Sequence, residues 1–151
     1  MTKKKVIVYT AGTFDLFHYG HLNILLKAKL MGDKFIVGVS TNRLIKAYKK
    51  INPIINYKER ASIIKELSCV DKVIKQKSFF DIKQLKKYNI DLIVLGSDWE
   101  EIKFPELEEF LSLSKAKVIY VPYTEHLSSS KIKEKIIRNS YDIIKNQTRR
   151  V

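Results

Sequence analysis

Two histidines and a glycine near the start of the chain have the types and spacing of a phosphate site. His18, Gly20 and His21 stand in the stretch GTFDLFHYGH, after the apolar run VIVYT and before leucines at helical spacing, so they join a predicted strand to a predicted helix. The first turn of a helix attracts phosphate through its unpaired N–H groups and its dipole. Gly20 leaves room for a phosphate beside the backbone, and the imidazoles add donors on the same turn. The pattern differs from a P-loop, because no GxxxxGK[ST] string occurs.

The rest of the chain predicts a sheet that positions this stretch. β-Branched runs alternate with helical patterns, so we expect one Rossmann-like, doubly wound α/β domain over 1–151, with a five-stranded parallel sheet, a core of about 5–137 and a C-terminal helix to about 146. The predicted strands are 5–10, 34–40, 70–75, 91–97 and 117–123, and the predicted helices are 21–32, 57–68, 80–89, 104–114 and 128–146. The basic segment 43–55, interrupted by Pro53, is expected to be a loop or lid with one helical turn. Such sheets bind ligands beyond the carboxyl ends of their strands.

Composition narrows the partners and the compartment. The 151 residues carry a formal net charge of +13, which suits a polyanionic partner such as a phosphorylated substrate or nucleic acid, although no recognised nucleic-acid-binding motif occurs. The one cysteine, Cys69, excludes a disulfide within the chain. No apolar run approaches the roughly 20 residues that span a bilayer, and the N-terminus lacks the apolar segment of a signal peptide. We therefore expect a cytoplasmic protein that does not bind membranes.

The string GTFDLFHYGH, placed between a strand and a helix, resembles the signature of the HxGH nucleotidyltransferase superfamily. YKERASIIKELSCVDKVI, DLIVLGSDWE and VPYTEHLSSSKIKEKI follow in order, and over residues 5–137 the chain is similar to glycerol-3-phosphate cytidylyltransferases. The resemblance implies a homodimer in which the phosphate of a small phosphorylated alcohol attacks the α-phosphorus of CTP and pyrophosphate leaves. Catalysis is then positioning and charge stabilisation. It also implies Mg²⁺, carried mainly by the nucleotide phosphates, and no dedicated metal site in the protein.

The resemblance further implies a role for individual residues. The predicted catalytic residues are His18, His21, Lys46 and Arg60. The predicted nucleotide-binding residues are Thr13, Phe14, His18, His21, Asp98, Thr124, Ser128, Ser129 and Ser130. The candidates for binding the acceptor phosphate are Asp15, Lys46, Lys49, Tyr123 and His126. Some of these side chains have an ordinary structural alternative: Asp98 and the serines can cap helices, and Arg60 can be a surface arginine beside Glu59.

Three positions depart from the family pattern. Ser68 and Tyr123 stand where the family has arginine, and His126 stands where it has glycine. Two charges directed at phosphate or nucleotide are therefore missing, and a Cβ occupies a position at which a permissive backbone is expected. Tyr123 can instead stack on a base, and His126 can donate to a phosphate.

Because of these departures, the sequence is compatible with several hypotheses about the substrates and the function. The first is CTP with glycerol 3-phosphate. The second keeps the fold and the histidines, and it is an adenylyltransferase or cytidylyltransferase acting on FMN, a sugar phosphate or another alditol phosphate. A third reading, of another class, is a basic nucleic-acid-binding protein or an inactive nucleotide-binding protein.

Overall fold

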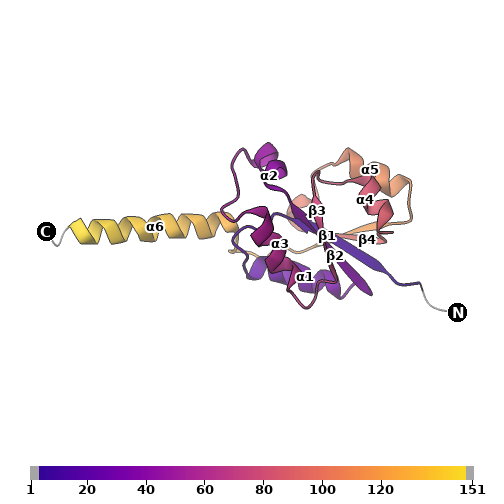
Figure 1. The fold of residues 1–151 in the computed structure, drawn as a ribbon, viewed down its shortest axis with the longest axis horizontal. Helices are drawn as coiled ribbons and strands as arrows, with labels where there is room; N and C mark the ends of the chain where they lie inside the picture. Colours follow the sequence, from indigo (N-terminus) through magenta and orange to yellow (C-terminus); the bar gives the residue numbers. More distant parts are fainter. Residues whose placement is uncertain (1–3, 149–151) are drawn as a thin grey trace.

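The computed structural model of the protein describes residues 4–148, which form a five-stranded parallel sheet (Figure 1). The strands are β1 (Ile7–Gly12), β2 (Lys34–Ser40), β3 (Lys72–Gln76), β4 (Leu92–Gly96) and β5 (Lys117–Val121). They pair in the order β3-β2-β1-β4-β5, and every pair is parallel. The predicted Rossmann-like α/β fold is confirmed. The predicted domain limits, 1–151, include 1–3 and 149–151, which lie outside the described residues, so they stay a prediction.

Helices cover both faces of the sheet. They are α1 (Tyr19–Lys29), α2 (Asn42–Lys49), α3 (Tyr57–Lys65), α4 (Ile82–Lys87), α5 (Pro105–Ser112) and α6 (Ser129–Thr148), with the 3₁₀ turn η1 (Ser97–Trp99). Leu25 of α1 and Ile64 of α3 pack in the core on one face, whereas Leu85 of α4 and Phe110 of α5 pack on the other. The chain crosses from β3 past β1 to β4, so the strand order reverses between β1 and β4. A doubly wound sheet binds its ligand at this reversal.

The central strands are apolar on both faces, as a sheet covered by two helical layers requires. In β2, Phe35 and Val37 belong to one core and Ile36, between them, belongs to the other. Gly38 interrupts this alternation for a steric reason. A Cβ at Gly38 would overlap the hydroxyl of Tyr9 on the neighbouring strand.

The segment predicted as a loop or lid, 43–55, begins with a regular helix instead. Thr41 caps α2, because its hydroxyl accepts a hydrogen bond from the Leu44 N–H at 3.2 Å. Leu44 and Ile45 are buried against the body, which stabilises two turns of helix that the basic residues obscured in the sequence. The helix ends at Lys50, which has a left-handed φ of 61°, and only the residues after it form the expected loop.

Helix α6 extends away from the sheet (Figure 1). Ile136, Ile137, Tyr141 and Ile143 are more than half exposed along it. Within residues 4–148, no helix combines the length and the apolar content needed to cross a membrane.

Candidate active site

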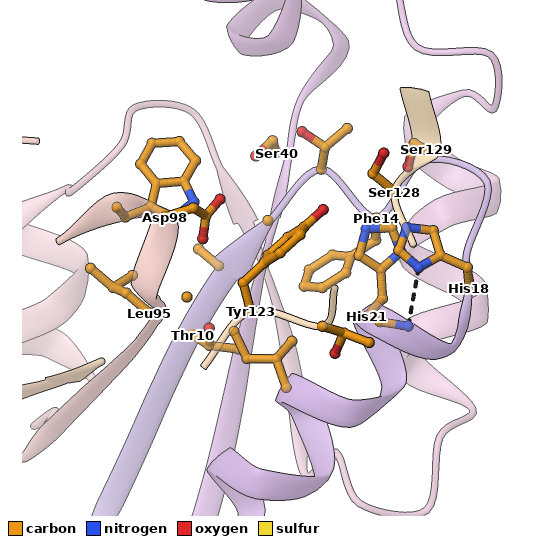
Figure 2. Close-up of a pocket in the computed structure, with 18 of the residues that line it drawn as sticks. Thr10, Phe14, His18, His21, Ser40, Leu95, Asp98, Tyr123, Ser128 and Ser129 are labelled. Carbon is orange, nitrogen blue, oxygen red and sulfur yellow. Dashed lines mark hydrogen bonds between the residues drawn. The ribbon is translucent and has the colours of Figure 1, made fainter. Parts of the chain in front are cut away.

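A pocket of about 280 Å³ opens at the carboxyl ends of the strands, where the strand order reverses (Figure 2). The segments after β1, β4 and β5 line it, together with the first turns of α1 and α6 and the end of α2. The predicted site residues in its lining are Thr13, Phe14, His18, His21, Lys49, Asp98, Tyr123, Thr124, Ser128, Ser129 and Ser130. The other four predicted residues, Asp15, Lys46, Arg60 and His126, lie outside the lining.

The two histidines form a stacked, neutral pair at the start of α1. His18 caps the helix, because its Nδ1 accepts a hydrogen bond from the Gly20 N–H at 3.1 Å. The proton of the neutral His18 ring is therefore on Nε2, from which it can be donated to a ligand. The His21 ring stacks on it with 3.8 Å between the centroids. Burial, then repulsion from His18 and Lys49, lowers the pKa of His21 to about 3, and burial also lowers the pKa of His18.

A polar atom of this pair is left unsatisfied. In the described part of the chain, the buried Nδ1 of His21 has no hydrogen-bond partner. Phe14 and Phe17 pack on the His21 ring, with centroids 5.4 and 5.7 Å away, and so fix its position. A buried polar atom without a partner costs roughly 1–3 kcal/mol. A phosphate oxygen that accepted a hydrogen bond from Nδ1–H would remove that cost.

Lys49, and not Lys46, reaches the pocket from α2. Lys49 lies one helical turn after the buried Ile45, so both project from the same side of the helix. Lys46 follows Ile45 directly, points about 100° away around the helix and is exposed. Burial and the charge of Lys133 lower the pKa of Lys49, although Asp15 opposes them. The register of α2 thus places Lys49 at the pocket, whereas the sequence favoured Lys46.

Arg60, predicted to be catalytic, is part of the framework. Its side chain is fully buried, and its guanidinium donates to the carbonyl of Ile55 at 2.8 Å, to the carbonyl of Thr13 and to Oδ1 of Asn42 at 2.8 Å. These contacts join the loop after β1 to the start of α2 and the loop before α3. A guanidinium held in this way positions the phosphate site and does not face it.

Asp15 is also structural, because its carboxylate is already occupied. It is 4% exposed and accepts hydrogen bonds from the N–H groups of Ile54 and Ile55 at 3.0 and 2.9 Å, and Lys133 of α6 lies 3.2 Å away. Burial raises the pKa of Asp15, but the two N–H donors and Lys133 outweigh it, so the pKa lies below its usual value. The carbonyl of Asp15 also accepts from Ser129 at 2.6 Å. Asp15 therefore connects the loop after α2 to α6.

The substitution Asp15→Asn is expected to destabilise the fold by about 1–3 kcal/mol at pH 7, because hydrogen bonds to a charged group are lost. Since the folded-state pKa is lowered, the contribution of the wild-type carboxylate is full above the unfolded-state pKa of about 4 and is lost as the pH falls through the folded-state pKa. Urea unfolding at several pH values measures this. An equal difference between wild type and variant at pH 7 and pH 3 would contradict the assignment.

The hydroxyl side chains at the other edge of the pocket have structural contacts and also line the pocket, whereas η1, which contains Asp98, has no side-chain cap. The Ser128 hydroxyl accepts from the Lys131 N–H at 3.1 Å and so caps α6, yet it lines the pocket. The Thr124 hydroxyl accepts from Asn23 of α1 at 3.0 Å. Asp98 lies in η1, directly after β4, and burial raises the pKa of its carboxyl. None of these contacts blocks the side that faces the pocket.

The departures from the family pattern fall in different places. His126, predicted as an acceptor-phosphate ligand, is exposed outside the pocket lining. Its φ of 62° is left-handed, which explains why a glycine is expected there. Ser68 is exposed in the turn before β3, at the opposite end of the strands from the pocket. Of the three, Tyr123 alone lines the pocket.

Two glycines leave room for the site. A Cβ at Gly12 would lie 3.0–3.3 Å from the ring of Phe14, and one at Gly20 would lie 3.0 Å from the ring of His18. The turn after β1 takes its left-handed residues from Phe14 and Leu16, with φ of 53° and 49°, and not from Gly12. Gly12 is thus needed for space at the floor of the pocket.

An aromatic wall on the far side of the pocket was missed in the sequence. Phe79 packs on Tyr48 and Phe104 with centroids 5.0 and 5.2 Å away, and Phe104 packs on Trp99 at 5.6 Å. All four line the pocket. Phe79 and Trp99 follow the ends of β3 and β4 within three residues, so their place in the predicted sheet was the available signal.

Comparisons with known proteins agree with this geometry. The family model described as cytidylyltransferase-like matches residues 9–135. A glycerol-3-phosphate cytidylyltransferase of Bacillus spizizenii is 41% identical over 133 residues, covering 87% of this chain and 95% of the relative. An FAD synthase of Thermococcus sibiricus is 37% identical over 144 residues, covering 91% and 97%.

A solved structure is similar as well. The lipopolysaccharide core biosynthesis protein of Thermoplasma volcanium superposes with a TM-score of 0.66 at 27% identity, covering 82% of this chain and all of that one. The fold, the pocket with its histidine pair and these relatives lead to one conclusion. The chain belongs to the cytidylyltransferase-like family and is a nucleotidyltransferase.

Proposed function

We propose that the protein transfers the cytidylyl group of CTP to a small phosphorylated alcohol, with glycerol 3-phosphate as the first candidate. The observation that carries this is the neutral, stacked pair of His18 and His21 at the start of α1, with Lys49 in the same pocket. The 41% identity with a glycerol-3-phosphate cytidylyltransferase supports the choice of substrates. The pocket of about 280 Å³ also favours a small acceptor.

The chemistry needs no general base. An oxygen of the acceptor phosphate, already ionised near neutral pH, forms a bond to the α-phosphorus of CTP, and the bond to the bridging oxygen of pyrophosphate breaks with its electron pair. Nε2–H of His18 and the single N–H of the neutral His21 ring are placed to donate to the phosphate oxygens, where charge develops. The N–H groups at the starts of α1 and α6 add to this. Lys49 supplies a cation for the acceptor phosphate.

Mg²⁺ is expected to accompany the nucleotide. The pocket offers oxygen donors of the kind that this ion prefers, from Thr124 and Ser128. Residues 4–148 contain no group of three or more His, Cys, Asp or Glu side chains that could hold a metal ion. The phosphates would therefore be its main ligands, and when bound it neutralises charge on the leaving pyrophosphate.

Pyrophosphate release tests the proposal directly. CTP and ATP are each offered with glycerol 3-phosphate, other alditol phosphates, sugar phosphates and FMN, with Mg²⁺ and with excess EDTA. We expect turnover with CTP and glycerol 3-phosphate that EDTA abolishes. Turnover with another pair alone would replace the substrates, and no turnover with any pair would overturn the proposed reaction.

An adenylyltransferase is the second candidate. The FAD synthase of Thermococcus sibiricus favours it, because that relative matches 91% of this chain at 37% identity. The same panel separates the two, since ATP with FMN would be the productive pair.

The assembly and the compartment belong to the same proposal. We expect a homodimer, with the exposed apolar side chains of α6, among them Ile137 and Tyr141, covered by a second copy. The acidic Glu134 and Asp142 alternate with basic residues along α6, so two antiparallel copies can pair opposite charges. Sedimentation equilibrium measures the mass of the assembly and so tests the homodimer.

We also expect a cytoplasmic location, where the nucleoside triphosphate is available.

A further inference from the structure

Tyr123 is held in the pocket by contacts that leave about half of the residue exposed. Its hydroxyl donates to the carbonyl of Leu127 at 3.1 Å, and its N–H donates to the hydroxyl of Ser97 at 3.1 Å. These bonds fix the side chain at both ends of the residue. The residue is nevertheless 48% exposed and lines the pocket. A tyrosine fixed in this way offers a rigid aromatic surface at little cost in conformational entropy.

The charges around the pocket indicate what this surface meets. Among the described lining residues, Lys49 is the one lysine or arginine, and it lies at the end of α2, on the side of β2. On the side of β4 and β5, the residues near Tyr123 are Asp98, which is acidic, and the apolar Pro122 and Leu127. Anionic phosphates are favoured near Lys49 and the histidines and disfavoured beside Asp98. The base, which is the uncharged end of a nucleotide, is therefore expected to lie on the side of the pocket that contains Tyr123.

The position of the ring agrees with this division. In Figure 2, Tyr123 lies between Asp98 on one side and Phe14 and His21 on the other. A nucleotide whose phosphates contact the histidines at the start of α1 would carry its base toward the Tyr123 ring. A planar base bound there would cover aromatic surface that water contacts in the free protein.

We infer that Tyr123 is the platform on which the base of the nucleotide substrate stacks, so that a π surface replaces the charge that the family pattern has at this position. The inference rests on the proposed function only in taking a nucleoside triphosphate as substrate. Stacking on an aromatic side chain tolerates any base. Tyr123 therefore contributes affinity for CTP and ATP alike and leaves discrimination between them to groups at the base edge.

The test compares a ligand that has a base with one that lacks it. Dissociation constants of CTP and of inorganic tripolyphosphate are measured by titration calorimetry for wild type, Tyr123→Ala, Tyr123→Phe and Leu30→Ala. For Tyr123→Ala we expect CTP to bind roughly 5- to 100-fold more weakly, with tripolyphosphate unchanged. Tyr123→Phe keeps the ring and should bind both ligands as wild type does. Leu30→Ala removes a side chain that is 87% exposed at the end of α1, outside the pocket lining, and should change neither.

Three results would overturn the inference. Unchanged CTP binding by Tyr123→Ala means that the ring does not contact the base. Equal weakening of CTP and tripolyphosphate means that Tyr123 only orders the loop before α6. If Tyr123→Phe binds CTP as weakly as Tyr123→Ala does, the hydroxyl and not the ring is responsible for the affinity. Thermal unfolding by circular dichroism checks that each variant is folded.

Failure of the proposed function gives a different result. If the wild-type protein binds CTP but makes no CDP-alcohol, the proposed reaction is refuted. The binding constants of the Tyr123 variants still test whether the base stacks on Tyr123. A wild type that binds only ATP moves the same comparison to ATP. A wild type that binds neither nucleotide refutes both.

Discussion

His18→Ala is expected to lower kcat by about 10²- to 10³-fold, the typical loss when one donor to a developing negative charge is removed. The structure supplies the reason. Nδ1 of His18 accepts from the Gly20 N–H, so the proton of the ring is on Nε2, and the stacked His21 ring holds its plane. Steady-state kinetics with CTP and the acceptor found in the pyrophosphate assay measure the loss.

The matched control for this prediction is His18→Asn. Asparagine is a good helix N-cap, so its side-chain oxygen can accept from the Gly20 N–H in place of Nδ1. It has no donor at the position of Nε2. We expect His18→Asn to unfold at a higher temperature than His18→Ala and to lose as much kcat. Wild-type kcat in His18→Asn would show that His18 acts only as a cap.

The pH dependence should follow from the same neutral pair. The pKa of His21 is about 3, so its ring gains no proton as the pH falls from 8 toward 6, and burial lowers the pKa of His18 from its usual value. Loss of activity at lower pH would then come from protonation of the acceptor phosphate, whose second pKa is about 6. An acceptor with a more acidic phosphate should move the activity profile to lower pH by the same amount.

Lys49→Ala is expected to have the second large effect. The loss of a charge-assisted bond to a phosphate costs roughly 1.5–3 kcal/mol, which corresponds to about 10- to 150-fold in kcat/KM for the acceptor. Lys49 lines the pocket, and burial lowers the pKa of its ammonium. Since Lys49 lies across the pocket from Asp98 and Tyr123, the KM of the nucleotide should change less than that of the acceptor.

Lys46→Ala is the control for Lys49→Ala. Both lysines belong to α2 and are exposed, but Lys49 lines the pocket and Lys46 does not. Removing it takes one positive charge from the same helix and leaves the pocket unchanged. A loss of activity with Lys46→Ala as large as that with Lys49→Ala would mean that only the general positive charge of α2 matters.

The sequence was sufficient for the features that depend on local pattern. The continuous apolar strands predicted a parallel sheet with both faces covered, and the strand–GTFDLFHYGH–helix order placed His18 and His21 at a helix start. The glycine expected at position 126 was also explained, because His126 has the left-handed φ that the pattern suggested. Hydrophobic periodicity and backbone preference depend on residues that are close together in the sequence. The sequence alone is therefore sufficient to predict these features.

The tertiary structure alone decided which charged side chains face the ligand. Arg60 and Asp15 are residue types that often occur in phosphate sites. Here, however, Arg60 donates to a backbone carbonyl and Asp15 accepts from two backbone N–H groups, and these partners are 39 to 47 residues away in the chain. The register of α2, set by burial of Leu44 and Ile45, placed Lys49 and not Lys46 at the pocket. The wall around Phe79 and Trp99 formed only when the ends of β3 and β4 came together with α2 and α5. Such choices depend on partners distant in the chain, and these are brought together only by the fold.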